Sequence, residues 1–374
     1  MSPSTPWIRT PRVVPRIRST SRSNALAALA GASGGGSVSG CRSFNTCETF
    51  TSPWPIDAMR CRASVRRFAG QWVSRELLER GWDVAGTSLE PTLLTGPNDL
   101  VRAVRWHVAD VRRDDDWARV LDAERPDAIL HLAGVAFVPE AQADPGMALE
   151  VNVIGAARLL AAVKTRRAAG SLDPVVLIIG SAEQYGRHAE PEMPLAETAE
   201  QRPHTVYAAS KAAQEHVALE AHRSAGVRVI ATRSFNHSGP GQADRFVLPG
   251  VVCRALALRS DGGRALALGN TTTVRDFLHV ADVARAYVDL IERGTAGEVY
   301  NVASGVGIDV GTLAKRVLAL VGVDAILSTD AALVRPAEVP ILIGDATKLR
   351  RATGWSPRFT FDSIIEDLIR AAAS

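Results

Sequence analysis

The segment from Val175 to Lys211 sets the strongest limit on what this chain can fold into. It opens with an unbroken apolar run, Val175-Val176-Leu177-Ile178-Ile179, which continues through Gly180 to Ser181. An apolar run without alternation is typical of a strand that is buried on both faces, as in a parallel sheet. Open α/β sheets bind ligands at the carboxyl ends of their strands, so the pattern places Ser181 at a ligand-binding edge.

Tyr207 and Lys211 follow in a segment, Val206 to Arg223, whose pattern predicts a helix. Their spacing of four residues places both side chains on one helix face. A lysine ammonium beside a phenol favours the phenolate and lowers the pKa of the tyrosine, which can then exchange a proton near neutral pH. The alternative is an ordinary surface pair. The only lysines of the sequence are Lys164, Lys211, Lys315 and Lys348. Because lysine is this scarce, its presence four residues after Tyr207 favours the catalytic interpretation.

Further buried strands and amphipathic helices alternate along the chain. Strands are expected at 82–87, 101–108, 127–134 and 226–233, and helices at 70–81, 147–167 and 206–223. Alternation of this kind predicts a doubly wound (Rossmann) parallel α/β sheet. We assign residues 58–234 to this core and residues 235–374 mainly to a smaller C-terminal substrate-binding lobe, with some return to the core.

Composition excludes several classes of protein. A net charge of +3 over 374 residues is too small to indicate nucleic-acid binding. No apolar run approaches the length that spans a bilayer, so no membrane association is expected. The four cysteines show no zinc-site or disulfide spacing, and we expect a cytoplasmic protein without a metal.

Residues 1–57 differ in composition from the rest. They are rich in Ser, Arg, Pro, Thr and Gly, and Glu48 and Asp57 are their only acidic residues. We expect a disordered extension or a wrongly assigned start. A transit peptide, which has a similar composition, is the alternative.

Ser181, Tyr207 and Lys211 together resemble the catalytic triad of the extended short-chain dehydrogenase/reductases, the NAD-dependent epimerase/dehydratase family. The resemblance covers roughly Phe68 to the C-terminus. It implies an oxidoreductase with NADP or NAD as cofactor, Tyr207 as proton donor, Ser181 as the residue that holds the reacting oxygen, and Lys211 as a contact to the nicotinamide ribose. It also implies a homodimer.

The phosphate-binding turn departs from the family pattern of a strand followed by GxxGxxG. Only Gly70 is in place, while Ser64 and Arg67 occupy the other two glycine positions. The preceding residues, 58–63, make a poor buried strand. Gly31 to Gly36 is another candidate, but it lies far before the strand at 82–87 and no convincing strand leads into it. We therefore expect impaired cofactor binding.

The resemblance implies further cofactor contacts. Asp110 and Val111 would contact the adenine, although Asp110 could instead cap a helix. Leu132, Ala133 and Gly134 would let the cofactor pass close to the backbone. Asn152 is expected to bond backbone near the active strands. Thr87 and Ser88 end their strand without an acidic residue for the ribose diol, which slightly favours NADP over NAD.

The resemblance also implies a sugar-nucleotide site. The loop Phe235-Asn236-His237-Ser238-Gly239-Pro240-Gly241-Gln242 resembles that of a branch that reduces GDP-6-deoxy-4-keto-mannose, and Asn236 would approach the sugar and diphosphate. Arg275 and Arg335 would meet phosphate, since guanidinium groups suit phosphate oxygens. Glu338 would accept hydrogen bonds from ribose hydroxyls.

The expected function is therefore reduction of the 4-keto group of a GDP-linked 4-keto-6-deoxyhexose. A nucleotide-sugar 4,6-dehydratase is the alternative, because Glu183 stands two residues after Ser181, where that branch carries an additional acid/base. An epimerase is a third possibility. A nucleotide-sugar-binding protein that lacks cofactor binding is the alternative that is not an enzyme, and the altered phosphate turn motivates it.

Overall fold

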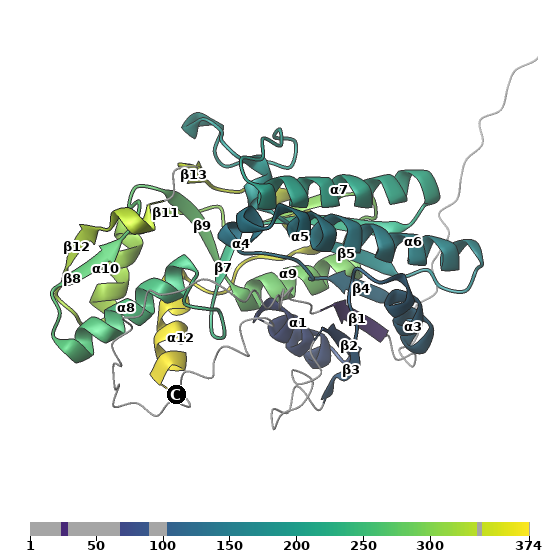
Figure 1. The fold of residues 1–374 in the computed structure, drawn as a ribbon, viewed down its shortest axis with the longest axis horizontal. Coiled ribbons are helices and arrows are strands. Elements are labelled where there is room, and N and C mark those ends of the chain that lie inside the picture. Colours follow the sequence, from purple (N-terminus) through teal and green to yellow (C-terminus); the bar gives the residue numbers. More distant parts are fainter. Residues whose placement is uncertain (1–23, 29–67, 90–102, 335–338, 374) are drawn as a thin grey trace, which may run out of the picture.

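A computed structural model describes residues 24–28, 68–89, 103–334 and 339–373. Its centre is a sheet of seven parallel strands in the order β10-β6-β5-β4-β1-β2-β3 (Figure 1). These are β1 (Asn24–Ala28), β2 (Asp83–Ser88), β3 (Arg105–Val108), β4 (Ala128–His131), β5 (Val175–Ser181), β6 (Arg228–Ser234) and β10 (Val299–Val302). The order 3-2-1-4-5-6 is that of the doubly wound fold, which confirms the predicted fold class.

The first strand was not expected from the sequence. Strand β1 lies between β2 and β4, with Leu26 opposite Ala85 on one side and Ile129 on the other. The expectation that residues 1–57 contribute nothing to the fold is therefore wrong for Asn24–Ala28. The expectation that no strand leads into Gly31 is also wrong, since β1 ends three residues before it.

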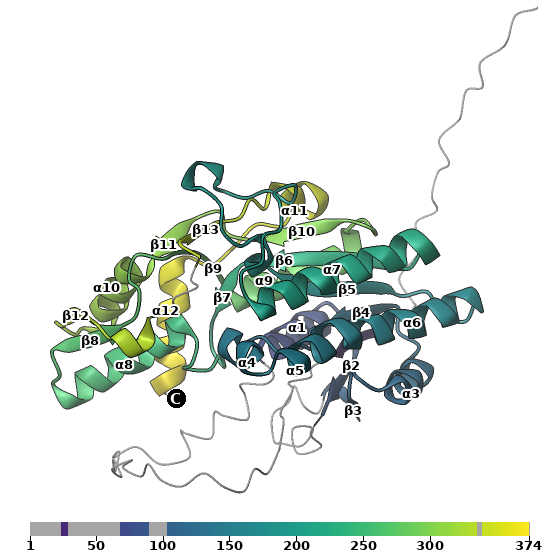
Figure 2. The ribbon, with the colours of Figure 1, turned by 45° about the horizontal axis from the view of Figure 1, so that its top comes forward.

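Helices cover both faces of the sheet (Figure 2). One face carries α3 (Asp114–Glu124), α4 (Val138–Ala143), α5 (Pro145–Leu149), the π-helical turn η4 (Glu150–Ile154), α6 (Gly155–Ala168) and α7 (Val206–Ala225). The other carries α1 (Phe68–Glu79), α9 (Val280–Arg293) and α11 (Thr347–Thr353). Each face has its own apolar core. The predicted strand at 175–179 is confirmed, and it is buried.

The second lobe is built by the C-terminal part of the chain and has a separate apolar core. It comprises β7 (Asn236–Ser238), α8 (Val247–Asp261), β8 (Ala265–Leu268), β9 (Val274–His279), β11 (Gly307–Asp309), α10 (Val310–Val321), β12 (Ile326–Thr329), β13 (Ile341–Leu342) and α12 (Phe361–Ala373). The short helices η5 (Ala182–Tyr185), η6 (Glu190–Glu192) and η7 (Ala331–Leu333) lie in connecting segments. Strand β9 pairs with β7, so the loop that follows β6 leads directly into this lobe.

The helical stretch Pro145–Ala168 corrects one expectation. By length and composition alone it could cross a membrane, whereas the sequence pattern indicated no run of that length. It packs on α7 and α3, and Leu159, Leu160 and Val163 along it are buried in the core. Those contacts account for its apolar composition, as in the core helix of a globular domain.

Candidate active site

Ser181, Tyr207 and Lys211 come together at the carboxyl end of β5, as the sequence predicted. Gly180 precedes Ser181, and a Cβ there would collide with the Thr232 carbonyl oxygen, so only glycine lets β5 run this close to β6. Helix α7 brings the other two side chains to the same edge. The Tyr207 hydroxyl interacts with the Ser181 side chain, and the Lys211 ammonium donates to the Ile179 carbonyl at 2.8 Å.

The pKa of Tyr207 differs from the prediction. Burial raises it to about 12; the hydrogen bond with Ser181 opposes the rise, and the negative charge of Glu183 adds to it. The prediction that Lys211 lowers this pKa is therefore wrong for the chain on its own, because the cost of desolvating a phenolate outweighs the favourable interactions. Tyr207 consequently holds its proton at neutral pH, which suits a proton donor.

Lys211 is buried, with 5% of its surface exposed. Burial lowers the pKa of its ammonium to about 8. The Nζ atom lies at the end of β4 as well, since a Cβ on Gly134 would be 3.3 Å from it. Two of its three donors are used, one by Ile179 and one by the Gln214 side chain, at 2.9 Å.

Asn152 links three elements of this edge. Its Oδ1 accepts from the Val135 backbone at 2.8 Å, and its Nδ2 donates to the Val135 carbonyl and to the Ser210 hydroxyl. These bonds confirm the prediction that Asn152 bonds backbone near the active strands. The residue sits in the π-helical turn η4, a local irregularity that is frequent at functional sites.

A buried polar network supports the Ser181 turn, and sequence reasoning missed it. Gln184 accepts from the Ser181 backbone N–H at 2.8 Å and donates to Glu215 at 2.9 Å. Glu215 receives a two-pronged ion pair from Arg233 and a further bond from Gln201. The only local sequence signal for this network is the pair Ser181 and Gln184, whose spacing of three residues is that of a helix capping box.

Replacing Glu215 with alanine should destabilise the protein strongly. The change leaves the Arg233 guanidinium buried without its carboxylate, which costs about 3–5 kcal/mol. We expect the melting temperature to fall by roughly 6–15 °C, measured by differential scanning calorimetry. Arg316→Ala, which breaks an exposed pair with Asp362, is the control and should leave the melting temperature nearly unchanged. Equal shifts in the two variants would contradict a supporting role for the network.

Several features of the β1–β4 edge fit a dinucleotide. A Cβ on Gly134 would lie 2.9 Å from Asn152 Oδ1, so only glycine lets the chain after β4 pass this close to Asn152. Among the described residues, buried Thr87 Oγ1 and both ring nitrogens of His131 have no hydrogen-bond partner. Ala133 is fully buried and Leu132 is half-buried at the same strand end. The carboxyl ends of β1 and β4 are the switch point of the sheet, where such folds bind ligands.

Asp110 and Val111 are less open to a ligand than the sequence suggested. The Asp110 carboxylate accepts from the Arg112 side chain and backbone N–H, and the Arg112 guanidinium lowers the pKa of that carboxyl despite partial burial. Val111 is buried, and its carbonyl accepts from Trp117. Neither adenine contact is tested by these interactions, and both remain predictions.

The loop after β6 meets the start of α1. The Phe68 ring stacks on His237 with 6.0 Å between centroids, and the Trp72 indole donates to the Pro240 carbonyl at 3.1 Å. Asn236, in β7, is half-buried at this junction. Gly70 is buried in the first turn of α1. The predicted sugar loop and the predicted cofactor helix are therefore neighbours.

Arg275 lies in β9, which joins β7 in the second lobe. Only 8% of its surface is exposed, and its guanidinium donates to the Val274 carbonyl at 3.0 Å. Its phosphate contact stays a prediction. Arg335 and Glu338 fall outside the described residues, as do Ser64, Arg67 and the glycines from Gly31 to Gly36.

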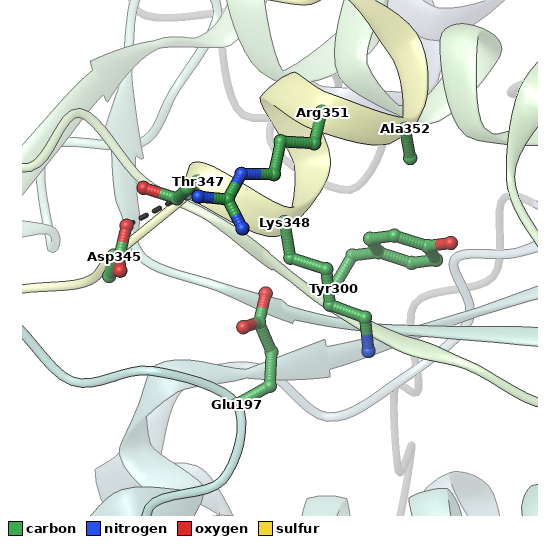
Figure 3. A pocket seen from close by; sticks show the side chains of 7 residues that line it. All are labelled: Glu197, Tyr300, Asp345, Thr347, Lys348, Arg351 and Ala352. Atoms are coloured by element: carbon green, nitrogen blue, oxygen red, sulfur yellow. Dashed lines mark hydrogen bonds between the residues drawn. The ribbon is translucent and has the colours of Figure 1, made fainter.

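The two described surface cavities lie elsewhere. One, of about 460 Å³, is lined by Glu197, Tyr300, Asp345, Thr347, Lys348, Arg351 and Ala352 (Figure 3). The other, of about 690 Å³, is formed by the C-terminal turn of α6 and nearby residues such as Lys164 and Asp173. Neither includes a predicted site residue. The candidate active site is thus identified by converging side chains at the sheet edge.

Comparisons with known proteins support this assignment. The family model for GDP-mannose 4,6 dehydratase matches residues 66–368. The chain is 38% identical over 248 residues to a GDP-6-deoxy-D-mannose reductase from Pseudomonas aeruginosa, which covers 66% of this chain and 80% of that protein. It is 31% identical over 295 residues to dTDP-glucose 4,6-dehydratase 1 from Escherichia coli, covering 74% of this chain and 80% of that protein.

Solved structures match the same fold. RMD from Pseudomonas aeruginosa complexed with NADPH superposes with a TM-score of 0.70 at 31% identity, covering 83% of this chain and 96% of that one. The UDP-glucose 4-epimerase of Thermus thermophilus in complex with NAD gives a TM-score of 0.70 at 27% identity, covering 83% of this chain and 97% of that one. The chain therefore belongs to the GDP-mannose 4,6 dehydratase family, within the NAD(P)-dependent extended short-chain dehydrogenase/reductases.

Proposed function

We propose that this chain is an NADPH-dependent reductase that converts the 4-keto group of a GDP-linked 4-keto-6-deoxyhexose into a hydroxyl. The observation that carries the proposal is the convergence of Ser181, Tyr207 and Lys211 at the end of β5. The similarity to a GDP-6-deoxy-D-mannose reductase supplies the substrate class. NADPH is chosen over NADH because β2 ends in Thr87 and Ser88 with no acidic residue for a ribose diol.

The side chains divide the reduction between them. When bound, NADPH would supply the hydride for C4 of the sugar. Tyr207 would give its phenolic proton to the oxygen at that carbon, while the Ser181 hydroxyl holds that oxygen in place. Lys211 would hold the nicotinamide ribose with its remaining donor. The carbonyl thus gains one hydride and one proton, and Tyr207 regains its proton from solvent.

The pKa of Tyr207 is compatible with reduction. Burial raises it to about 12, so Tyr207 carries its proton at neutral pH in the chain on its own. A reductase needs a tyrosine that still carries its proton when the alkoxide forms. The choice of a reductase over a dehydratase or epimerase rests on the similarity to a GDP-6-deoxy-D-mannose reductase.

Binding groups remote from the reacting carbon would hold the nucleotide. Asn236 lies at the junction of the two lobes, and Arg275 comes from the second lobe. We assign the diphosphate to Arg275 and Arg335 and the ribose hydroxyls to Glu338. Such contacts supply binding energy that orients the sugar at the catalytic residues.

Replacing Glu183 with glutamine separates the reductase from the dehydratase. Removal of a side chain that acts as general acid or base costs about 10²–10⁴-fold in rate. Because the proposed reduction uses Tyr207 alone for proton transfer, we expect Glu183→Gln to lose less than about fivefold in kcat. The loss of a negative charge should also lower the pKa of Tyr207, since Glu183 raises it. The measurement is NADPH oxidation with GDP-4-keto-6-deoxymannose.

A dehydratase is the second candidate, because Glu183 is half-buried beside the catalytic tyrosine. It would show the reverse pattern: conversion of GDP-mannose without net NADPH consumption, and a loss of more than about 10²-fold in Glu183→Gln. A protein that only binds nucleotide-sugar would bind GDP-mannose, and neither the parent protein nor Glu183→Gln would oxidise NADPH.

We also propose a cytoplasmic homodimer that pairs through the surface of α5 and the π-helical turn η4. Leu149 and Ile154 on this face are 44% and 45% exposed. Exposed apolar side chains at the surface of a long helix are common where subunits associate. Sedimentation equilibrium at micromolar concentration tests the pairing, and a monomer at every concentration would contradict it.

A further inference from the structure

Gln214 is a buried side chain beside the active site that the reaction as described does not use. It lies on α7, one turn after Lys211, and is completely buried. Its Oε1 accepts from the Lys211 ammonium at 2.9 Å. Its Nε2 is buried and has no hydrogen-bond partner among the described residues. An unpaired buried amide N–H is costly, so its presence calls for an explanation.

The described hydrogen-bond acceptors of Lys211 are neutral: the Ile179 carbonyl and the Gln214 amide oxygen. The buried carboxylate four residues later on α7, that of Glu215, is paired with Arg233. Other titratable groups of this edge are Tyr207 on the same helix and His131 on β4. Burial and the charge of Lys211 lower the pKa of His131 to about 3, so that ring is neutral as well. Burial alone accounts for the shift of Lys211.

A glutamate at position 214 could reach the same ammonium and would have no amide N–H to leave unpaired. It would, however, form a buried ion pair and cancel the positive charge. The chain instead has an acceptor of the same length without the charge. The Ile179 carbonyl and the Gln214 amide oxygen together hold the Lys211 Nζ atom in place. It lies close to Gly134, after the end of β4.

We propose that Gln214 is a positioning residue, which holds the Lys211 ammonium in place through a neutral acceptor so that its positive charge stays available to the active site. The kinetic part of this inference rests on the proposed reductase function. The effect on the charge state of Lys211 does not, because it belongs to the protein alone.

The test compares Gln214→Glu and Gln214→Met with the parent protein and with Lys211→Met. The first readout is the free energy of unfolding in urea between pH 7 and 10.5. Lys211 has a pKa of about 8 in the folded protein, below its ordinary value of 10.5, so the unfolded chain binds more protons between these values. The free energy of unfolding of the parent protein, minus that of Lys211→Met, should therefore rise as the pH increases across this range.

Gln214→Glu should shift the start of this rise to a pH that is higher by at least about one unit, because a carboxylate favours the charged ammonium of Lys211. Gln214→Met, which removes the acceptor, should move it downward. In steady-state reduction, both variants should lose at least about tenfold in kcat with little change in KM, and the basic limb of the kcat profile should move in the same directions.

The stability profile and the reduction kinetics together distinguish a failure of the inference about Gln214 from a failure of the proposed reductase function. Unchanged stability profiles in both Gln214 variants would overturn the inference, whether or not the protein reduces the sugar. Shifted stability profiles with unaltered kcat would overturn the positioning role. Shifted profiles in a protein that oxidises no NADPH, even in its parent form, would support the contact to Lys211 and refute the proposed function instead.

Discussion

Tyr207→Phe should lower kcat for reduction by about 10³-fold and leave KM within a few-fold of the parent value. The phenol is the proposed proton donor, and a positioned proton donor contributes about 10²–10⁴-fold to rate. Phenylalanine keeps the ring in its half-buried site at the end of β5 and removes only the hydroxyl. The loss should therefore fall on the transition state, which affects kcat and kcat/KM alike. NADPH oxidation under substrate saturation measures it.

Tyr300→Phe is the matched control. The Tyr300 hydroxyl accepts from the Thr295 backbone N–H, and its side chain lines the cavity in Figure 3, whose lining includes none of the catalytic residues. This variant should keep nearly the full kcat. Retention of more than about a tenth of the activity in Tyr207→Phe would mean that another group gives the proton.

Deletion of residues 35–67 should tighten NADPH binding by at least about tenfold. Strand β1 ends at Ala28, and α1 begins at Phe68 with Gly70 in its first turn. With the intervening stretch removed, the sequence reads Gly31-Ala32-Ser33-Gly34-Phe68-Ala69-Gly70, which restores the GxxGxxG spacing. We interpret residues 35–67 as an insertion inside the phosphate-binding motif. These residues lie outside the described part of the chain.

The restored turn gives the expected size. A glycine-rich turn lets the backbone N–H groups at a helix N-terminus approach a pyrophosphate, and the helix dipole favours its charge. A tenfold gain in affinity corresponds to about 1.4 kcal/mol, which is about the contribution of one hydrogen bond to a charged group. The roughly sixfold shorter connection lowers the loop-closure cost of folding by about 1.6 kcal/mol, and this affects stability rather than cofactor affinity.

Fluorescence titration of NADPH into both forms measures the change. Gly34→Arg in the shortened chain is the control, because a large side chain at the second glycine should crowd the pyrophosphate and reverse the gain. Equal affinity in the full-length and shortened chains would show that residues 35–67 do not interrupt the motif.

The catalytic edge could be predicted because its signals are local. The apolar run before Ser181, the four-residue spacing of Tyr207 and Lys211, and the position of Asn152 all depend on neighbours in the sequence. In the structure, these residues converge as that reasoning expected. Their roles in catalysis stay predictions until the variants are measured.

Strand β1 was missed because its sequence carries almost no strand signal. Asn24-Ala25-Leu26-Ala27-Ala28 contains no β-branched or aromatic residue, and Asn and Ala are depleted in strands. Its place follows only from pairing with β2 and β4, which come much later in the chain. The sequence therefore offered only residues 58–63, next to the predicted helix at 70–81, and these make a poor buried strand.

The pKa of Tyr207 and the Gln184–Glu215–Arg233 network could not be predicted for a related reason. Desolvation depends on everything that packs around a group, and spacing along a helix does not report it. Gln184 and Glu215 are separated by 31 residues, and their contact exists only once α7 lies against β5 and β6.

The most direct test of the proposed reductase is the stoichiometry of NADPH consumption with GDP-4-keto-6-deoxymannose. The full-length and shortened chains should each be assayed at saturating cofactor, with nucleotide and sugar products quantified together by chromatography. We predict one NADPH oxidised for each 4-keto-sugar converted to a GDP-linked 6-deoxyhexose. Conversion of GDP-mannose to the 4-keto-sugar without net NADPH consumption would contradict the reductase and identify a dehydratase.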